Sequence, residues 1–267
     1  MNTFLLYFKK VFVRIANITR LNKVLRYISD KYEKKQNPIN TNKNMPVKTG
    51  WSILVITDGK SKESLDIFIK SAEKELKNSP YEIIVVGPTK LDLSYFSKKI
   101  PIIHTPYKEL GLWGVPGGIS RKKNFGAQFA KYDKMVISHD YVVFTPGWKK
   151  GFDDVDFTAG TNVVLNKDGK RHRDWITITI DPPFIRYNFV PYDKSHNEQQ
   201  YLNGTYFFIK RDFFLDNPLD EKLRWGEGED VYWSIEIRKK IKFTMNTKST
   251  VSYSKLKPDD EWKMIKL

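Results

Sequence analysis

Short apolar runs alternate with helical patterns through the first half of the chain, and this alternation limits the fold more than any other feature of the sequence. Apolar runs that end at turn residues predict buried strands at 52–57, 81–86, 100–104 and 135–137. Apolar residues repeating every three or four positions predict helices at 62–77 and 119–132. Elements in this order are typical of an α/β sheet with helices on both faces. The carboxyl ends of its parallel strands would meet at one edge, where such sheets bind ligands.

The second half of the chain has a different pattern. It predicts strands at 156–165, 175–180 and 206–210, separated by long loops, and a helix at 229–240. We interpret both halves as one domain that spans residues 51–267.

A basic segment precedes this domain. Residues 1–35 carry an apolar stripe interleaved with Lys and Arg, which predicts an amphipathic helical extension, and residues 36–50 are polar, which predicts a linker. Two interpretations of the helix stay open: it lies on an anionic membrane surface, or it packs on the domain or on a second subunit. Because no run of about 18 uncharged apolar residues occurs, we expect a cytoplasmic protein, with peripheral membrane attachment as the further option.

The net charge of +15 favours anionic partners. These include polyanions, anionic membranes and phosphorylated small molecules. The charge is not accompanied by zinc-finger spacing, an RNA-binding aromatic motif or a helix-turn-helix pattern, so we do not expect nucleic-acid binding. The absence of cysteine excludes disulfides and thiolate metal sites.

Ser138-His139-Asp140 ends the strand predicted to begin at residue 135. A carboxylate in this place would lie at the ligand edge of the sheet, and its hard oxygen atoms suit Mg²⁺ or Mn²⁺. His139 would add an imidazole ligand. The alternative interpretation is that Asp140 only caps the following turn.

Gly117 and Gly118 precede the segment Ile-Ser-Arg-Lys-Lys-Asn at residues 119–124. Backbone N–H groups, the helix dipole and the side-chain cations would together attract an anion at this helix start. The alternative is a solvated basic helix face.

Glu229 and Asp230 follow the glycine-rich turn that begins at Trp225 and precede the last predicted helix. One of the two carboxylates would accept a proton from an attacking hydroxyl group. The alternative is that acidic residues in a first turn only stabilise the helix.

The order and spacing of these motifs resemble those of inverting glycosyltransferases of the GT-A fold, especially the family 2 type, over residues 51–253. The matching segments are 52–57, 82–86, 119–127, 138–140, Pro-Gly-Trp at 146–148 and 203–207. The Trp-Gly-x-Gly-Glu-Asp turn at 225–230 is also similar to that of β-1,4-galactosyltransferases. The resemblance implies a mixed, Rossmann-like sheet flanked by helices in a single catalytic domain. It further implies transfer of a sugar from a nucleotide sugar, such as a UDP-sugar, to a hydroxyl acceptor, with inversion at the anomeric carbon.

The resemblance also implies a role for each matching residue. Asp230 would be the general base, and Glu229 would help to hold the acceptor, which would be a glycan, a lipid-linked sugar or a protein bound by the second half of the domain. Asp140 and His139 would bind Mn²⁺ or Mg²⁺. The donor would be bound by the following residues, with Lys123 at its diphosphate: Thr57, Asp58, Arg121, Lys123, Asn124, Ser138, His139 and Gly204.

Three departures from the family pattern concern the donor and the metal. Ser138 replaces the first aspartate of the metal motif, and Gly87-Pro88 stands where many members have an aspartate near the base. Residues 251–254 read Val-Ser-Tyr-Ser where many members have a metal-binding histidine. A protein with so few ligands would bind metal weakly. The alternative function is therefore a catalytically degenerate GT-A-fold protein that binds nucleotides or glycans, although the intact Glu229-Asp230 pair argues against it.

Overall fold

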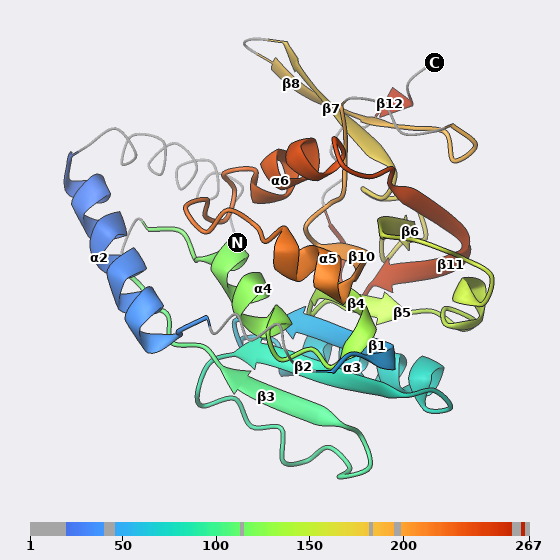
Figure 1. The fold of residues 1–267 in the computed structure, drawn as a ribbon, viewed down its shortest axis with the longest axis horizontal. Coiled ribbons are helices and arrows are strands. Elements are labelled where there is room, and N and C mark those ends of the chain that lie inside the picture. The colour runs from blue at the N-terminus through green and yellow to red at the C-terminus, as the bar shows by residue number, and fades with distance from the viewer. Residues whose placement is uncertain are drawn as a thin grey trace.

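A computed structural model describes residues 20–39, 46–112, 115–181, 184–194, 199–257 and 263–264. Within these residues the central element is an eight-stranded mixed sheet in the order β3-β2-β1-β4-β10-β6-β11-β5 (Figure 1). Its strands are β1 (Lys48–Ile56), β2 (Tyr81–Gly87), β3 (Ile102–Pro106), β4 (Tyr132–His139), β5 (Val142–Phe144), β6 (Ala159–Leu165), β10 (Tyr206–Lys210) and β11 (Thr244–Tyr253).

Strand β1 lies at the centre of the parallel half of the sheet, between β2 and β4. Ile53 and Val55 share a hydrophobic cluster with helix α3 (Lys62–Leu76). Leu54 and Ile56 belong to a second cluster with helix α4 (Ile119–Ala127). Because alternate residues of a strand point to opposite faces, β1 is buried on both sides. The predicted α/β sheet with helices on both faces is confirmed.

The second half of the chain completes the sheet and adds a smaller one. Strand β10 runs antiparallel to both β4 and β6, and β11 runs parallel to β6. A four-stranded sheet lies beyond helix α6, at the top of Figure 1. The remaining elements are η1 (Lys150–Phe152), β7 (Ile176–Asp181), β8 (Phe184–Phe189), β9 (Gln200–Tyr201), α5 (Arg211–Asp216), α6 (Glu229–Ile237) and β12 (Lys263–Met264).

The structure differs from the prediction at the ends of two helices and at strand β11. Helix α4 ends at Ala127 and α6 at Ile237, earlier than the predicted 132 and 240. After the helix the chain forms a turn, in which the N–H groups of Phe129 and Ala130 donate 3.1 Å hydrogen bonds to the carbonyls of Gly126 and Ala127. Strand β4 then begins at Tyr132. Strand β11 was not predicted, because its sequence Thr-Met-Asn-Thr-Lys-Ser-Thr-Val-Ser-Tyr is mostly polar. Its place in the sheet comes from pairing with β6 and β5.

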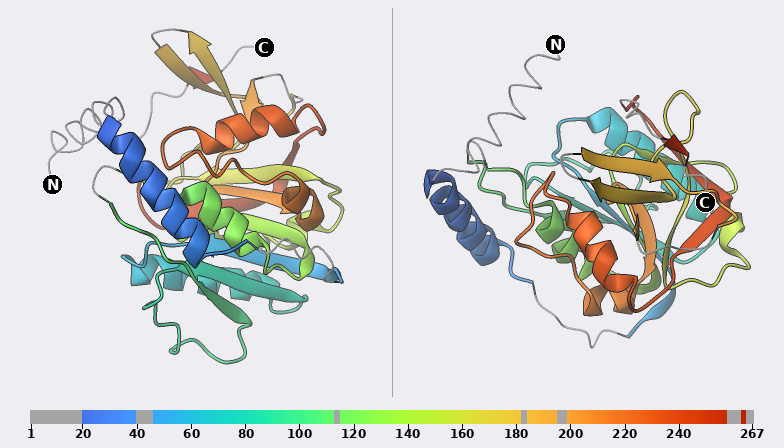
Figure 2. Two further views of the ribbon diagram at one scale, coloured as in Figure 1. Left: turned by 60° about the vertical axis from the view of Figure 1, so that its left-hand side comes forward. Right: turned by 90° about the horizontal axis from the view of Figure 1, so that it is seen from above.

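Helix α2 (Arg20–Gln36) packs beside α4 on one side of the domain (Figure 2). Arg26 donates two 2.8 Å hydrogen bonds to the Glu227 carboxylate. Asn37, in the predicted linker, exchanges two 2.8 Å hydrogen bonds with the backbone of Lys108. For residues 20–36 these contacts agree with the interpretation that the helix packs on the domain. Residues 1–19 of the predicted extension and 40–45 of the linker lie outside the described residues.

Buried charges lie at the centre of this contact. Glu33 is 1% exposed and accepts hydrogen bonds from Ser29 Oγ at 2.8 Å and from the Tyr107 hydroxyl at 2.9 Å. Arg224 is 2% exposed, with Nη1 3.5 Å from the Glu33 carboxylate and Nη2 bonded to Asp30. A buried charge that loses its partner destabilises a protein. Because Glu33 and Asp30 belong to α2 and Arg224 to the domain, these ion pairs fix where α2 docks.

None of the described helices is both long enough and apolar enough to cross a lipid bilayer.

We expect Tyr107→Phe to lower the free energy of unfolding by about 1.5–3 kcal/mol, the range for a hydrogen bond to a charged group. The ring can still pack edge-on against Phe125, but the buried Glu33 carboxylate loses this donor. Urea unfolding measures the change. Tyr27→Phe, on the exposed side of α2, is the matched control. Equal losses in the two variants would contradict a role for the buried carboxylate.

Candidate active site

The carboxyl ends of β1 and β4 bring Thr57 and Asp140 together. The strands pair in parallel with Ile56 opposite His139, so the residues that follow them are neighbours. Thr57 Oγ1 donates a 2.6 Å hydrogen bond to Asp140 Oδ2 and accepts a 3.0 Å bond from the Gly59 N–H. The turn after β1 therefore holds the Asp140 carboxylate in one orientation.

The two acidic residues at this edge differ in their surroundings. Burial raises the pKa of Asp140, although the hydrogen bond from Thr57 and the charge of Lys255 oppose the rise. Asp58 lies on the exposed side of the turn. Its carboxylate accepts a 3.0 Å bond from the Lys60 N–H and lies 3.1 Å from the Lys60 ammonium. Both residues were predicted to bind the donor; in the structure Thr57 faces Asp140 and Asp58 faces Lys60.

The residues predicted to bind a divalent cation do not make a set of three ligands. No group of three or more His, Asp or Glu side chains suited to a metal ion occurs in the part of the chain that the structure describes. Asp140 is engaged by Thr57, and His139 has its ring 5.5 Å from that of Tyr141. Because Mg²⁺ and related cations take several oxygen ligands, these two adjacent residues do not fit a protein-built metal site.

His139 lies in positively charged surroundings. Burial, and then the charges of Lys123, Lys257, Lys255 and Lys122, hold the pKa of His139 well below its usual range. Its Nε2 atom is buried and has no hydrogen-bond partner among the described residues. The positive charges of these lysines favour an anion over a cation at this position.

Gly204 joins three of the predicted site residues, and we call Lys123, Gly204, Glu229 and Asp230 the Gly204 clamp. The Gly204 carbonyl accepts a 2.8 Å bond from Lys123 Nζ, and its N–H donates a 2.7 Å bond to Asp230 Oδ2. Glu229 Oε1 lies 3.7 Å from Lys123 Nζ. A Cβ atom on residue 204 would stand 2.9 Å from Nζ and 3.1 Å from Asp230 Cβ, so a larger residue would displace one of them.

Lys123 is fully buried under this glycine, although it was predicted to face a diphosphate. Burial lowers the pKa of Lys123, and the charges of Glu229 and Asp230 oppose that change. Burial likewise raises the pKa of Glu229, and Lys123 opposes it. Each partner therefore offsets the cost of burying the other. The structure places Glu229 against Lys123, and not at a surface open to an acceptor.

Asp230 is the second residue of helix α6, and its side chain is half-buried. Its Oδ1 accepts a 2.9 Å bond from the Val231 N–H, while Oδ2 accepts the bond from Gly204. Each carboxylate oxygen has a second lone pair, so Asp230 can still accept a hydrogen bond from a ligand. Gly228, immediately before the helix, has a φ of 79°, a conformation that favours glycine.

The Gly204 clamp and the carboxyl ends of β1 and β4 belong to one site. The His139 N–H donates a 3.0 Å hydrogen bond to the Thr205 carbonyl, so Gly204 lies beside the end of β4. Thr57, Asp140, Gly204 and Asp230 thus come from four separate segments and meet at one edge of the sheet.

Three residues predicted to bind the donor are occupied by other parts of the chain. Arg121 pairs with Glu221 and donates a 3.1 Å bond to the Asn37 carbonyl. Asn124 donates to the Leu219 carbonyl at 2.8 Å and accepts from its N–H at 3.1 Å. Their bonds tether α4 to the loop before α6. The third residue is Ser138, which is fully buried and donates a 3.1 Å bond to a neighbouring carbonyl.

The sequence prediction did not include the residues that follow β11. Lys255 and Lys257 lie over the ring of Tyr141, with their Nζ atoms 4.3 and 3.8 Å from its centre. A signal was present, because both lysines come within three residues of the segment 251–254, which departs from the family pattern by lacking a metal-binding histidine.

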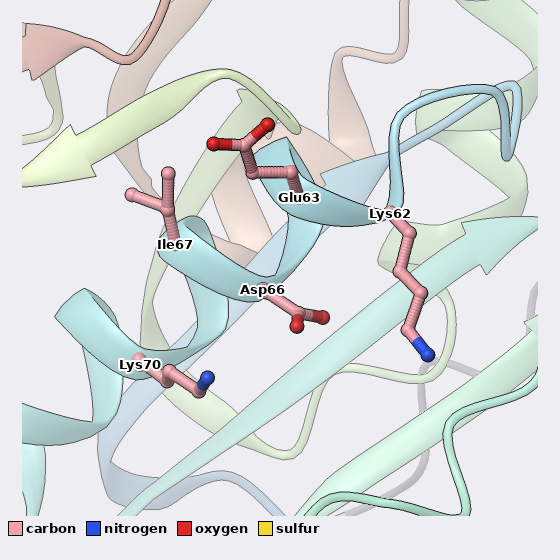
Figure 3. A pocket seen from close by; sticks show the side chains of 5 residues that line it. All are labelled: Lys62, Glu63, Asp66, Ile67 and Lys70. Carbon is pink, nitrogen blue, oxygen red and sulfur yellow. The ribbon is translucent and has the colours of Figure 1, made fainter.

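A hollow of about 500 Å³ lies elsewhere, along helix α3 (Figure 3). It is lined by Lys62, Glu63, Asp66, Ile67 and Lys70, all from that one helix. Its walls include none of the residues of the Gly204 clamp or of the strand edge. We therefore assign it no part in the site.

Comparisons with known proteins identify the fold. The sequence matches no protein-family model, and no curated protein matches it. The crystal structure of GalNAc-T7 with UDP, GalNAc and Mn²⁺ is similar, with a TM-score of 0.57 and 14% identity over 83% of this chain and 45% of that one. S. aureus TarS 1–349 in complex with UDP-GlcNAc has a TM-score of 0.54 and 12% identity, over 78% of this chain and 59% of TarS. This chain thus spans about half the length of these structures. At such identities the likeness shows the fold alone, and the chain has the GT-A fold.

Proposed function

We propose that this chain is a glycosyltransferase that moves a sugar from a nucleotide sugar, such as a UDP-sugar, to a hydroxyl group of a glycan, lipid-linked or protein acceptor. The observation that carries the proposal is the half-buried Asp230 carboxylate, held by Gly204 at the sheet edge that also carries Thr57 and Asp140. The neighbours GalNAc-T7 and TarS, described with UDP and UDP-GlcNAc, support a donor of this class.

In the proposed reaction Asp230 accepts the proton of the acceptor hydroxyl as its oxygen attacks the anomeric carbon. The bond between that carbon and the diphosphate oxygen breaks, and its electron pair leaves with the nucleoside diphosphate. Attack from the face opposite the leaving group inverts the configuration.

The acceptor side of the site is formed by the turn before α6. Trp225 is 65% exposed, and Tyr232, in the first turns of the helix, is 56% exposed. Exposed aromatic rings near a catalytic carboxylate suit the C–H faces of a sugar acceptor. Arg26 of helix α2 also contacts this turn, through its two hydrogen bonds to Glu227.

We expect Trp225→Ala to raise the KM for the acceptor about tenfold, because a stacked aromatic contact contributes on the order of 1.4 kcal/mol. The kcat value should change much less, since the ring does not take part in bond making. Steady-state kinetics with varied acceptor measures both constants. Tyr27→Ala, an exposed aromatic residue on α2, is the control. An unchanged KM would place the acceptor elsewhere.

The proposed function is tested by measuring nucleotide release from a panel of nucleotide sugars, with and without hydroxyl acceptors. Acceptor-dependent release of nucleoside diphosphate is the expected result, and NMR of the product gives the anomeric configuration. Retention of configuration would contradict the inverting mechanism.

A binding protein without activity is the second candidate, and the missing set of three metal ligands among the described residues favours it. In that case nucleotide sugars bind, but no acceptor produces transfer. The same panel, followed by calorimetric titration of each nucleotide sugar, separates the two functions.

A further inference from the structure

Two lysines share one aromatic platform next to the strand edge. Tyr141 directly follows Asp140, and its ring carries the ammonium groups of Lys257 at 3.8 Å and Lys255 at 4.3 Å. Edge-to-face packing against Tyr253, with ring centres 5.3 Å apart, holds the platform. The Tyr141 hydroxyl also lies 3.2 Å from Thr205 Oγ1, which belongs to the residue after Gly204. Tyr141 therefore connects the two lysines to the segments that carry Asp140 and Gly204.

Positive charge is concentrated at this platform. Burial, together with the charges of Lys255 and Arg173, lowers the pKa of Lys257 to about 8, and the charge of Asp140 opposes this change. Lys255 and Lys257 also act on His139, whose buried Nε2 has no hydrogen-bond partner among the described residues. Like charges held this close destabilise one another. An anion that accepts hydrogen bonds from both ammonium groups relieves this repulsion.

The chemistry of the proposed reaction supplies such an anion. A diphosphate carries about two negative charges in the donor and gains one more as the bond to the sugar breaks. Charge that develops in the transition state is stabilised by groups that are already in position. Asp140 alone is a poor site for a divalent cation, because the nearby positive charges of Lys255 and Lys257 would repel the cation.

We propose that Lys255 and Lys257 bind the diphosphate of the nucleotide-sugar donor and stabilise the leaving nucleoside diphosphate, in the role that a divalent cation has in metal-dependent enzymes. This inference rests on the proposed function. The lysines transfer no proton: Asp230 takes the proton of the acceptor hydroxyl, the electron pair of the broken bond stays on the diphosphate oxygen, and the two ammonium groups donate hydrogen bonds to that oxygen. Asp140 then orients the lysines and is not a metal ligand.

The test is calorimetric titration of the whole protein with UDP, GDP, CDP and dTDP, in EDTA and again with MnCl₂. We expect one of these nucleotides to bind in EDTA with an affinity that Mn²⁺ changes less than about threefold. Lys255→Met and Lys257→Met should each weaken that binding about tenfold or more, in line with the loss of one charge-assisted hydrogen bond. The corresponding nucleoside, which has no phosphate, should bind the variants and the wild type equally.

Two further variants test whether the effect comes from the charge and position of the lysines. Lys257→Arg retains the charge and should recover most of the affinity, and Lys248→Met, on the exposed part of β11, should change nothing. Binding that requires Mn²⁺ and is unaffected in both lysine variants would overturn this inference and leave the proposed function intact. If no nucleoside diphosphate binds the wild type with or without metal, the proposed function fails together with the inference.

Discussion

Asp230→Asn should lower kcat by about 10²–10⁴-fold, the usual contribution of a positioned general base. A hydroxyl group is too weak an acid to lose its proton before it attacks, so the carboxylate must take that proton during the reaction. The amide keeps the size of the side chain, and its oxygen can still accept the bond from Gly204. Steady-state kinetics gives kcat, and titration with the donor nucleotide should show little change in affinity.

Asp230→Asn also affects the stability of helix α6, and this effect must be distinguished from the loss of catalysis. The amide nitrogen would face the Val231 N–H, which now donates to Asp230 Oδ1. This loss at the helix start costs about 1 kcal/mol, so unfolding of the variant is measured in parallel. Glu236→Gln, an exposed acid on the same helix, is the control. A near-normal kcat in Asp230→Asn would contradict the assignment of Asp230 as the general base.

Lys123→Met should destabilise the protein by about 3–5 kcal/mol at pH 8, the range for breaking a buried ion pair by removing one partner. The variant leaves Glu229 buried without its counter-charge and removes the 2.8 Å bond to the Gly204 carbonyl. Urea unfolding measures the loss. The double variant Lys123→Met/Glu229→Gln should recover a large part of it, because no charge then remains buried.

The pH dependence of that loss follows from the direction of the Glu229 shift. Burial already raises the pKa of Glu229, and removing Lys123 takes away the charge that opposes the rise. A folded state with the higher pKa binds the proton more tightly than the unfolded state, so the variant gains stability as the pH falls. The difference from wild type should therefore shrink from pH 8 toward pH 5. A loss that is the same at every pH, with no recovery in the double variant, would contradict the pairing.

The parallel half of the fold could be predicted from the sequence because burial on both faces leaves continuous apolar runs. Ile53 to Ile56 in β1 are an example, since all four are buried against α3 or α4. Strand β11 could not be predicted in this way. Its alternating polar residues are held by pairing with strands that lie far apart in the sequence.

The candidate site was predictable only where a residue lies at the end of a regular element. Thr57 and Asp140 directly follow neighbouring strands and Asp230 lies in the first turn of a helix, so their places follow from the order of these elements. Arg121 and Asn124 differ because their side chains contact a loop about 100 residues further along the chain. No local pattern records that contact. The chemical roles of all these residues remain predictions.

Helix α2 and the turn before α6 are thermodynamically linked, because they share the bonds of Arg26 with Glu227 and of Arg224 with Asp30. A ligand that orders this turn must bind more tightly when α2 is docked than when it is released. By reciprocity the same ligand must hold α2 in place by an equal free energy. Saturation with acceptor should then slow the hydrogen exchange of the α2 amides, even though the helix lies outside the site where the sugar is transferred.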